Sequence, residues 1–353
     1  MLHSYYNGMT GKFYDNRYDA IVDKFHNNQS VLFYYRDNEY ERVNWLIEPK
    51  ETLNQLYKER AQQIRDTYDH VVICYSGGID STNVLETFYY NNIHIDEIVC
   101  VGSFSQDTSG DIDQNHNKDI YSNVVPTLNM MHLPNTKKTF LDYTTYFNNL
   151  SNFSLYNDYG IEYYKYIGFY PSVTYLFWYD LPKFLNLKKN SVIIYGVEKP
   201  FPHIDDKGKF YFEFTDASMM SYSKYDINSY ARVNFYSDPE SEKIILKQHH
   251  LIKNYYSELF SMGMINCRES FTKKNSKYLD VIHKIIYDTK NPLTYVSKKG
   301  SNSFLSVRDS YLPKKKNSDI WNFYGKSISH MIKNYNINIG TKYTFSTKRY
   351  YIT

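Results

Sequence analysis

The chain has 353 residues, a hydrophobic content of 42% and a net charge of +3, which suffices for one large or two modest domains with a filled core. It contains no run of about 18 apolar residues that would span a membrane, and its first residues lack the charged and apolar regions of a signal peptide. Three cysteines are too few for a disulfide framework or a four-cysteine zinc site. We therefore expect a soluble, cytoplasmic protein with no membrane partner, whose weakly basic charge does not favour nucleic acid.

Residues 1–50 have the pattern of a small β-rich leader. The apolar segments 31–35 and 42–46 flank polar residues 36–39, which suit a hairpin turn. The next segment, 51–68, carries apolar residues at helical spacing and a charged opposite face. The sequence thus predicts a hairpin and then one helix before the first core strand.

Strand-like and helix-like segments alternate over residues 51–200. We expect strands at 71–75, 97–103, 139–142 and 191–195, and helices at 81–90, 118–132 and 173–184. Such alternation is typical of a Rossmann-like α/β fold, in which helices cover both faces of a parallel sheet. Ligands of these sheets bind beyond the carboxyl ends of the strands, where the strand order reverses.

The alternation ends after Tyr195. A strand is expected at 208–214, after a turn at 206–209, and helices at 242–259, 278–287 and 319–333. We expect residues 201–353 to form a mostly helical region that closes the site. His249 and His250 point about 100° apart on their helix, so we expect surface positions and no metal pair.

Residues 75–82 read Tyr-Ser-Gly-Gly-Ile-Asp-Ser-Thr, between a predicted strand and a predicted helix. Unpaired N–H groups and the positive end of the helix dipole attract phosphate at a helix N-terminus. Gly77 and Gly78 permit a positive φ and a close approach of the backbone to an anion. Hydroxyl donors come from three residues of the turn, Ser76, Ser81 and Thr82.

Asp80 adds a second requirement to this turn. A carboxylate repels a polyphosphate unless a hard cation lies between them, and Mg²⁺ is usually held by one or two carboxylates together with substrate phosphates. The turn therefore predicts a nucleotide and Mg²⁺. It is not the common P-loop, Gly-x-x-x-x-Gly-Lys-Ser/Thr. Gly325-Lys326-Ser327 ends like one, but residue 320 is Ile.

The Ser-Gly-Gly-Ile-Asp-Ser run at 76–81 resembles the PP-loop of the ATP pyrophosphatases, the adenine nucleotide alpha-hydrolase-like superfamily with a HUP-type sheet. This superfamily includes asparagine synthetase, NAD and GMP synthetases, tRNA lysidine synthetase and the deazaguanine synthases. The layout is most similar to the synthetase domain of asparagine synthetase, which also has a helix leading into the first nucleotide-binding strand. The resemblance implies ATP and Mg²⁺ as cofactors, release of AMP and pyrophosphate, β- and γ-phosphates held by residues 76–81, and a metal on Asp80.

The resemblance also implies roles at two other strand ends. Adenine is expected near the end of the second strand, at Gly102, Ser103 and Phe104. After the fourth strand, Glu198 is expected to help hold Mg²⁺, and Lys199 to neutralise charge on the α-phosphate. The Gly-x-x-x-Asp-Glu form of some members is absent here. The few cysteines also speak against the thiolating members and the zinc-dependent deazaguanine synthases.

Residues 235–240, Phe-Tyr-Ser-Asp-Pro-Glu, precede a helix that carries Gln248 and His249. This combination is similar to uncharacterised phage-borne PP-loop proteins, which implies the cytoplasm of a virus-infected host cell as a location. We expect the segment to form a substrate wall.

Three hypotheses of function remain open at this stage. The first is an Mg²⁺-dependent ATP pyrophosphatase that adenylates a carboxylate or carbonyl oxygen of a small molecule and passes it to ammonia or an amine. No glutaminase domain precedes the PP-loop, so ammonia is expected from solution or from a partner. The second is a nucleobase or tRNA modification enzyme with the same chemistry, and the third is a nucleotide-binding module without turnover. The expected regions are a leader (1–50), a PP-loop core (51–200) and a closing region (201–353).

Overall fold

A computed structural model describes the chain over the following residues: 5–102, 104, 117–142, 146, 150–152, 154–160, 174–185, 187–197, 202–216, 230–263, 276–287, 319–337 and 343–353. Within these ranges, no helix has both the length and the apolar character that a membrane crossing requires.

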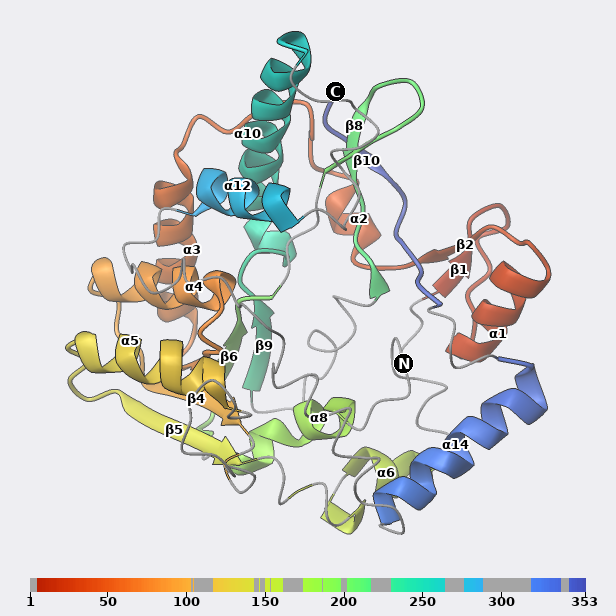
Figure 1. Cartoon of the computed structure of the whole chain (residues 1–353), viewed down its shortest axis with the longest axis horizontal. Helices are drawn as coiled ribbons and strands as arrows, with labels where there is room; N and C mark the ends of the chain where they lie inside the picture. Colours follow the sequence, from red (N-terminus) through yellow and green to blue (C-terminus); the bar gives the residue numbers. More distant parts are fainter. Residues whose placement is uncertain are drawn as a thin grey trace.

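From the N-terminus, the described segments form a group of short strands and helices and then a core in which strands and helices alternate. A C-terminal part that contains long helices follows (Figure 1). The strands are β1 (Tyr5–Asn7), β2 (Val31–Phe33), β3 (His70–Cys74), β4 (Glu97–Gly102), β5 (Lys137–Asp142), β6 (Ser191–Tyr195), β7 (His203–Ile204), β8 (Phe210–Phe212), β9 (Tyr230–Asn234) and β10 (Tyr350–Tyr351). The α-helices are α1 (Arg17–Ile21), α2 (Asp37–Tyr40), α3 (Leu53–Thr67), α4 (Ile79–Tyr90), α5 (Val125–Met130), α6 (Ser154–Tyr159), α8 (Thr174–Phe184), α10 (Glu242–Ser261), α12 (Ser276–Ile286) and α14 (Asp319–Tyr335). Two π-helical turns, η1 (Val22–His26) and η4 (Ile120–Val124), and two 3₁₀ turns, η6 (Leu150–Asn152) and η8 (Pro239–Ser241), complete the set.

The centre of the molecule is a five-stranded, all-parallel sheet with the order β5-β4-β3-β6-β9. The first strand of this sheet along the chain is therefore the central strand β3. Strands β4 and β5 follow on one side of it, and β6 and β9 follow on the other side. This is the doubly wound Rossmann-like order. The strand order reverses between β3 and β6, so the crevice between their carboxyl ends is the expected position of a ligand.

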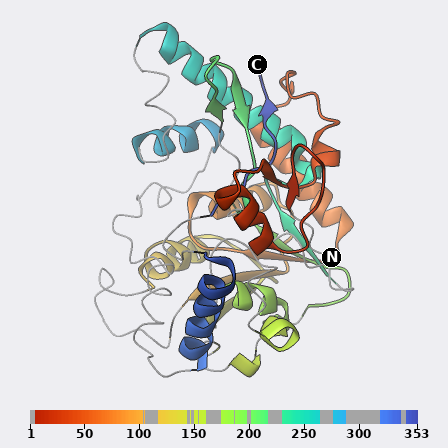
Figure 2. The same cartoon turned by 90° about the vertical axis from the view of Figure 1, so that its right-hand side faces the viewer.

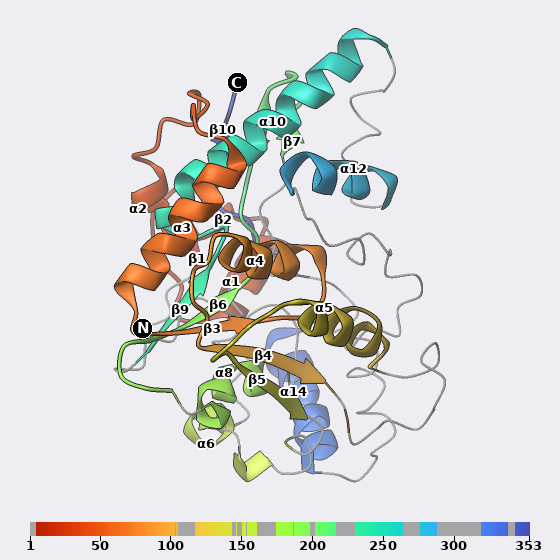
Figure 3. The ribbon, with the colours of Figure 1, turned by 90° about the vertical axis from the view of Figure 1, so that its left-hand side faces the viewer.

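Helices cover both faces of this sheet (Figure 3). The helices α4 and α5 lie on one face, and α6 and α8 lie on the other. Strand β6 is buried along its whole length, and so is β3 up to Ile73. Burial on both faces explains why these strands read as continuous apolar runs and were predicted at nearly their observed positions.

One expectation about the core was wrong. The alternation does not end at Tyr195, because β9 adds a fifth parallel strand beside β6 and α10 follows it. The expected helix at 118–132 is confirmed over residues 118–130, with a π-helical turn, η4, in front of α5. The region 201–353 thus contains core strand β9 as well as helices.

The leader also differs from its prediction. Strand β2 pairs with β1, and residues 37–40 form helix α2, so the expected hairpin around 36–39 is wrong. The N-terminal elements pack against the C-terminal segment (Figure 2). The backbone N–H of Phe33 donates to the carbonyl of Ser346, and Arg17 pairs with Asp216 at 3.1 Å, both side chains being buried.

A second, three-stranded sheet has the order β10-β8-β7. Its β7–β8 hairpin confirms the expected turn, with Gly208 at φ +78°. Helix α10 runs beside this sheet and buries both histidines. His249 Nδ1 contacts Ile245 O, and His250 Nε2 contacts Trp45 O. Their expected surface position was wrong, because the consecutive residues 248–250 of α10 are all buried.

Candidate nucleotide site

The glycine turn lies at the point where the strand order reverses. Strand β3 ends at Cys74, and α4 begins at Ile79 with Gly78 as its N-cap. Gly77 adopts φ +72°, a left-handed conformation that favours glycine. Gly78 is extended, with φ −77° and ψ 158°. The prediction of a positive φ is therefore right for Gly77 and wrong for Gly78.

The hydroxyl groups of the turn lie close together. Ser76 Oγ and Ser81 Oγ are 3.1 Å apart, and Ser81 Oγ donates to Gly78 O at 3.0 Å. Thr82 is fully buried, and its hydroxyl donates to the same carbonyl at 2.9 Å. Ser76 is the exposed hydroxyl of the three. Thr82 therefore braces the turn from inside, whereas Ser76 is accessible to solvent.

Gly196, directly after β6, lies against the start of α4. A Cβ atom at this position would be 2.8 Å from Ser81 Cα and 3.0 Å from Ser81 N. Cys74 and Tyr195 are register partners in the sheet, so the turns that follow β3 and β6 leave it at the same level. The two loops that flank the crevice thus meet without an intervening side chain at Gly196.

The end of β4 is equally crowded. A Cβ atom on Gly102 would be 2.6 Å from Ile120 Cδ1 and 2.8 Å from Phe104 Cζ. Gly102 and Phe104, two of the three adenine candidates, therefore lie side by side. The third, Ser103, lies outside the described residues, as do Glu198 and Lys199.

Asp80 is half-buried in the first turn of α4 and is held by two tyrosines. Tyr287 Oη donates to its Oδ1 at 2.5 Å, and Tyr236 Oη donates to its backbone carbonyl at 2.8 Å. Burial, and then the negative charge of Asp80, hold the pKa of the Tyr287 phenol well above its ordinary value. Tyr287 thus stays protonated and remains a donor over the physiological pH range.

The described residues contain no group of three or more His, Cys, Asp or Glu side chains placed to hold a metal. A preformed protein cage for a cation is therefore absent from this part of the chain. The donor set instead fits a cation shared with a nucleotide, because Mg²⁺ commonly binds to one or two carboxylates and several phosphate oxygens. Asp80 offers such a carboxylate at the phosphate side of the turn.

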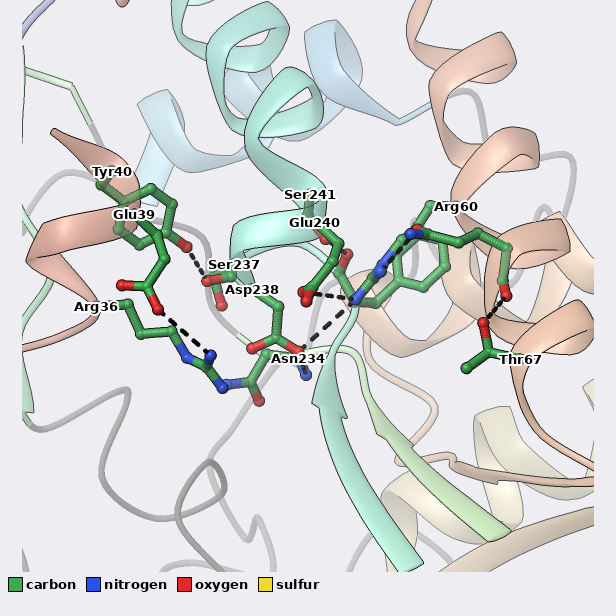
Figure 4. A network of polar contacts seen from close by, with 12 residues as sticks. Arg36, Glu39, Tyr40, Arg60, Thr67, Asn234, Ser237, Asp238, Glu240 and Ser241 are labelled. Atoms are coloured by element: carbon green, nitrogen blue, oxygen red, sulfur yellow. Dashed lines mark hydrogen bonds and ion pairs between the residues drawn. The ribbon is translucent and has the colours of Figure 1, made fainter. Parts of the chain in front are cut away.

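The segment after β9 forms a charged network around the buried pair of Arg60 and Asp238 (Figure 4). Asp238 lies between Arg36 and Arg60 in this network, and Arg60 Nη2 is 3.7 Å from its Oδ2. Burial raises the pKa of Asp238 to about 6, although both arginines lower it. Glu240 also pairs with Arg60, at 3.8 Å. The segment 235–240, which was expected to form a substrate wall, is thus a structured loop that places Tyr236 beside Asp80.

Sequence reasoning missed the roles of Tyr236 and Tyr287. The chain has 40 tyrosines, so a tyrosine near any motif carries no signal by itself. A separate hollow of about 510 Å³ is lined by residues 43–46, by three residues of the β7–β8 turn and by the C-terminal Tyr351 and Thr353. It includes no residue of the glycine turn. Its position therefore does not alter the choice of the β3–α4 crevice, where the backbone turn and the carboxylate meet.

Comparison of the chain with protein-family models and with curated proteins gives no match.

Proposed function

We propose that the chain is an Mg²⁺-dependent ATP pyrophosphatase that adenylates a carboxylate or carbonyl oxygen of a small molecule and transfers the activated group to ammonia or an amine. The observation that carries this proposal is the Ser76–Ser81 turn at the reversal of strand order, with Gly77 left-handed and Gly196 against Ser81. A nucleotide in this crevice meets the N-terminus of a 12-residue helix.

Different groups around the crevice bind different parts of the nucleotide. Backbone N–H groups of the first turn of α4 and the Ser76 hydroxyl face the β- and γ-phosphates. Gly102 and Phe104 offer a crowded, partly apolar end of β4 for the adenine ring. Asp80 supplies the carboxylate for the cation, which when bound neutralises phosphate charge.

The reaction requires two displacements. The acceptor oxygen attacks the α-phosphorus, the bond between the α- and β-phosphates breaks, and pyrophosphate leaves. The nitrogen nucleophile then attacks the activated carbon, the bond from that carbon to the oxygen of AMP breaks, and the nitrogen loses a proton. The crevice can serve the first step because it orients phosphates by backbone groups that are already fixed by the sheet.

The test is product analysis with ATP labelled at the α- or γ-phosphate, in the presence of Mg²⁺ and separate pools of amino acids, nucleosides, tRNA and ammonia. AMP and pyrophosphate formed only with the amino-acid and ammonia pools support the proposal. The same products formed only with nucleosides or tRNA identify a nucleobase-modifying enzyme. ADP and phosphate contradict the proposal, and tight ATP binding without turnover identifies a nucleotide-binding module.

Asp80→Ala is the matched variant for this assay. We expect it to lower the rate of AMP formation at least ~100-fold, because charge neutralisation by a bound cation is worth several kcal/mol. Asp66→Ala removes an exposed carboxylate from α3 and is the control. Equal rates for the Asp80 and Asp66 variants would remove Asp80 from the site.

A further inference from the structure

Tyr287 follows α12 and is anchored at its backbone. Its N–H donates to His283 O at 2.8 Å, and the hydroxyl of Tyr57 donates to the preceding carbonyl, Ile286 O, at 2.7 Å. Tyr57 Oη in turn accepts a hydrogen bond from the buried Gln248 Nε2 at 2.9 Å. The chain is thus fixed on both sides of the peptide bond that leads into Tyr287.

Three buried tyrosine rings pack together beside Asp80. The ring centroids of Tyr236 and Tyr287 are 5.6 Å apart, and that of Tyr57 lies 5.9 Å from Tyr236 and 6.4 Å from Tyr287. The three side chains are at most 2% exposed. They come from α3, from the loop after β9 and from the end of α12, so three distant segments meet at the first turn of α4.

The backbone carbonyl and the side-chain carboxylate of Asp80 both accept hydrogen bonds from tyrosines of this cluster. Tyr236 Oη contacts its carbonyl and accepts a hydrogen bond from Asn83 Nδ2 at 2.9 Å, so this tyrosine fixes the backbone of the turn. Tyr287 Oη contacts the carboxylate at Oδ1. A hydrogen bond from a fixed donor to Oδ1 restricts the side-chain torsions of Asp80 and so sets the direction of its carboxylate.

We propose that Tyr287 is a positioning residue that orients the Asp80 carboxylate toward the divalent cation of bound nucleotide, an inference that rests on the proposed function. Groups that hydrogen-bond to a metal ligand fix its orientation, and their loss commonly lowers metal affinity 10- to 100-fold. The arrangement also ties metal binding to the docking of α12, because Tyr287 reaches Asp80 only when the end of that helix is in place.

The test measures binding of Mn²⁺ in the presence of α,β-methylene-ATP, whose α–β linkage resists cleavage, by electron paramagnetic resonance of free Mn²⁺. We expect Tyr287→Phe to lower Mn²⁺ affinity about 10-fold, with nucleotide binding in the presence of EDTA unchanged. Tyr350→Phe is the control, since it removes a buried tyrosine hydroxyl that donates to a different carboxylate, that of Asp37. Far-ultraviolet circular dichroism and thermal unfolding verify that both variants are folded.

A double-mutant cycle separates orientation from general loosening of the cluster. In an Asp80→Ala background, Tyr287→Phe should change Mn²⁺ affinity by less than about twofold, because the side-chain oxygen that accepts its hydrogen bond is already absent. Unchanged affinity in the Tyr287→Phe single variant, an equal loss in Tyr350→Phe, or tighter binding of Mn²⁺ would overturn the inference alone. A wild-type protein that binds α,β-methylene-ATP neither with nor without Mn²⁺ would overturn the proposed function and this inference with it.

Discussion

Gly77 and Gly208 share one conformation but differ in their surroundings. Both have a positive φ, +72° and +78°, yet a Cβ on Gly77 would be 2.9 Å from Val124 Cγ2, whereas a Cβ on Gly208 would meet nothing within 4 Å. A left-handed alanine costs about 1–2 kcal/mol at either site. Only at Gly77 does the added methyl group also press on a neighbour, here on the segment that precedes α5.

We therefore expect Gly77→Ala to lower both stability and ATP affinity, and Gly208→Ala to lower stability alone. Urea unfolding measures the first effect, and isothermal titration with ATP and Mg²⁺ measures the second. Unchanged ATP affinity in Gly77→Ala would show that the nucleotide does not contact this turn.

At the same scale, sequence reasoning found the turn but not the side chains that support it. A glycine pair with Ser, Asp and Ser at fixed spacing is a local pattern that carries its own chemistry. Tyr236 and Tyr287 reach Asp80 from 156 and 207 residues away in sequence, and no local pattern identifies them. The turn and its carboxylate were therefore identifiable from the sequence, whereas the tyrosines that hold Asp80 were not.

At the scale of elements, strands buried on both faces of the sheet were predicted correctly. Strand pairing was predicted wrongly where the partner strand is not the next one along the chain. Strand β6 is apolar throughout and was predicted at its observed bounds. Strand β9 was missed because Arg232 and Asn234 interrupt its apolar pattern. The partner of β2 is β1, which lies before α1 in the chain, so the local turn signal at 36–39 pointed to the wrong neighbour.

The loop after β9 makes the fold sensitive to pH. The pKa of Asp238 rises from 3.8 to about 6 in the folded protein, because burial outweighs the attraction of Arg60 and Arg36, while Glu240 adds to the rise. A raised carboxyl pKa means that the folded state binds the proton more tightly than the unfolded state. The contribution of this group is fully present below pH 3.8 and is lost as the pH rises through 6.

We expect Asp238→Asn to remove this part of the pH dependence, a change on the order of 3 kcal/mol. The measurement is the free energy of unfolding in urea at several pH values between 4 and 7. Glu240→Gln, which changes the more exposed partner of Arg60, is the control and should retain most of the slope. Identical slopes in wild type and Asp238→Asn would contradict the assignment.

At the scale of the whole molecule, the leader and the C-terminal segment meet at a buried ion pair between Arg17 and Asp216. Arg17 and Asp216 are at most 5% exposed, and Asp216 also accepts hydrogen bonds from Tyr5 Oη at 3.0 Å and from Phe345 N at 3.1 Å. Removing one member of such a pair leaves an uncompensated buried charge and typically costs 3–5 kcal/mol, whereas neutralising both costs less. Residues near both ends of the chain thus stabilise one common cluster.

We expect Arg17→Met to destabilise the protein by about 3 kcal/mol or more, and Arg17→Met with Asp216→Asn to restore part of that loss. Urea unfolding followed by circular dichroism gives both values. Strict additivity of the two changes would indicate that the buried charges do not interact.

The most direct test of the account is a crystal structure of the protein with α,β-methylene-ATP and Mg²⁺. The account predicts β- and γ-phosphates against the backbone N–H groups of residues 77–81, the cation bound to Asp80, and the Tyr287 hydroxyl still on the other carboxylate oxygen. A nucleotide bound away from the turn between β3 and α4, or a cation bound without Asp80, would contradict it.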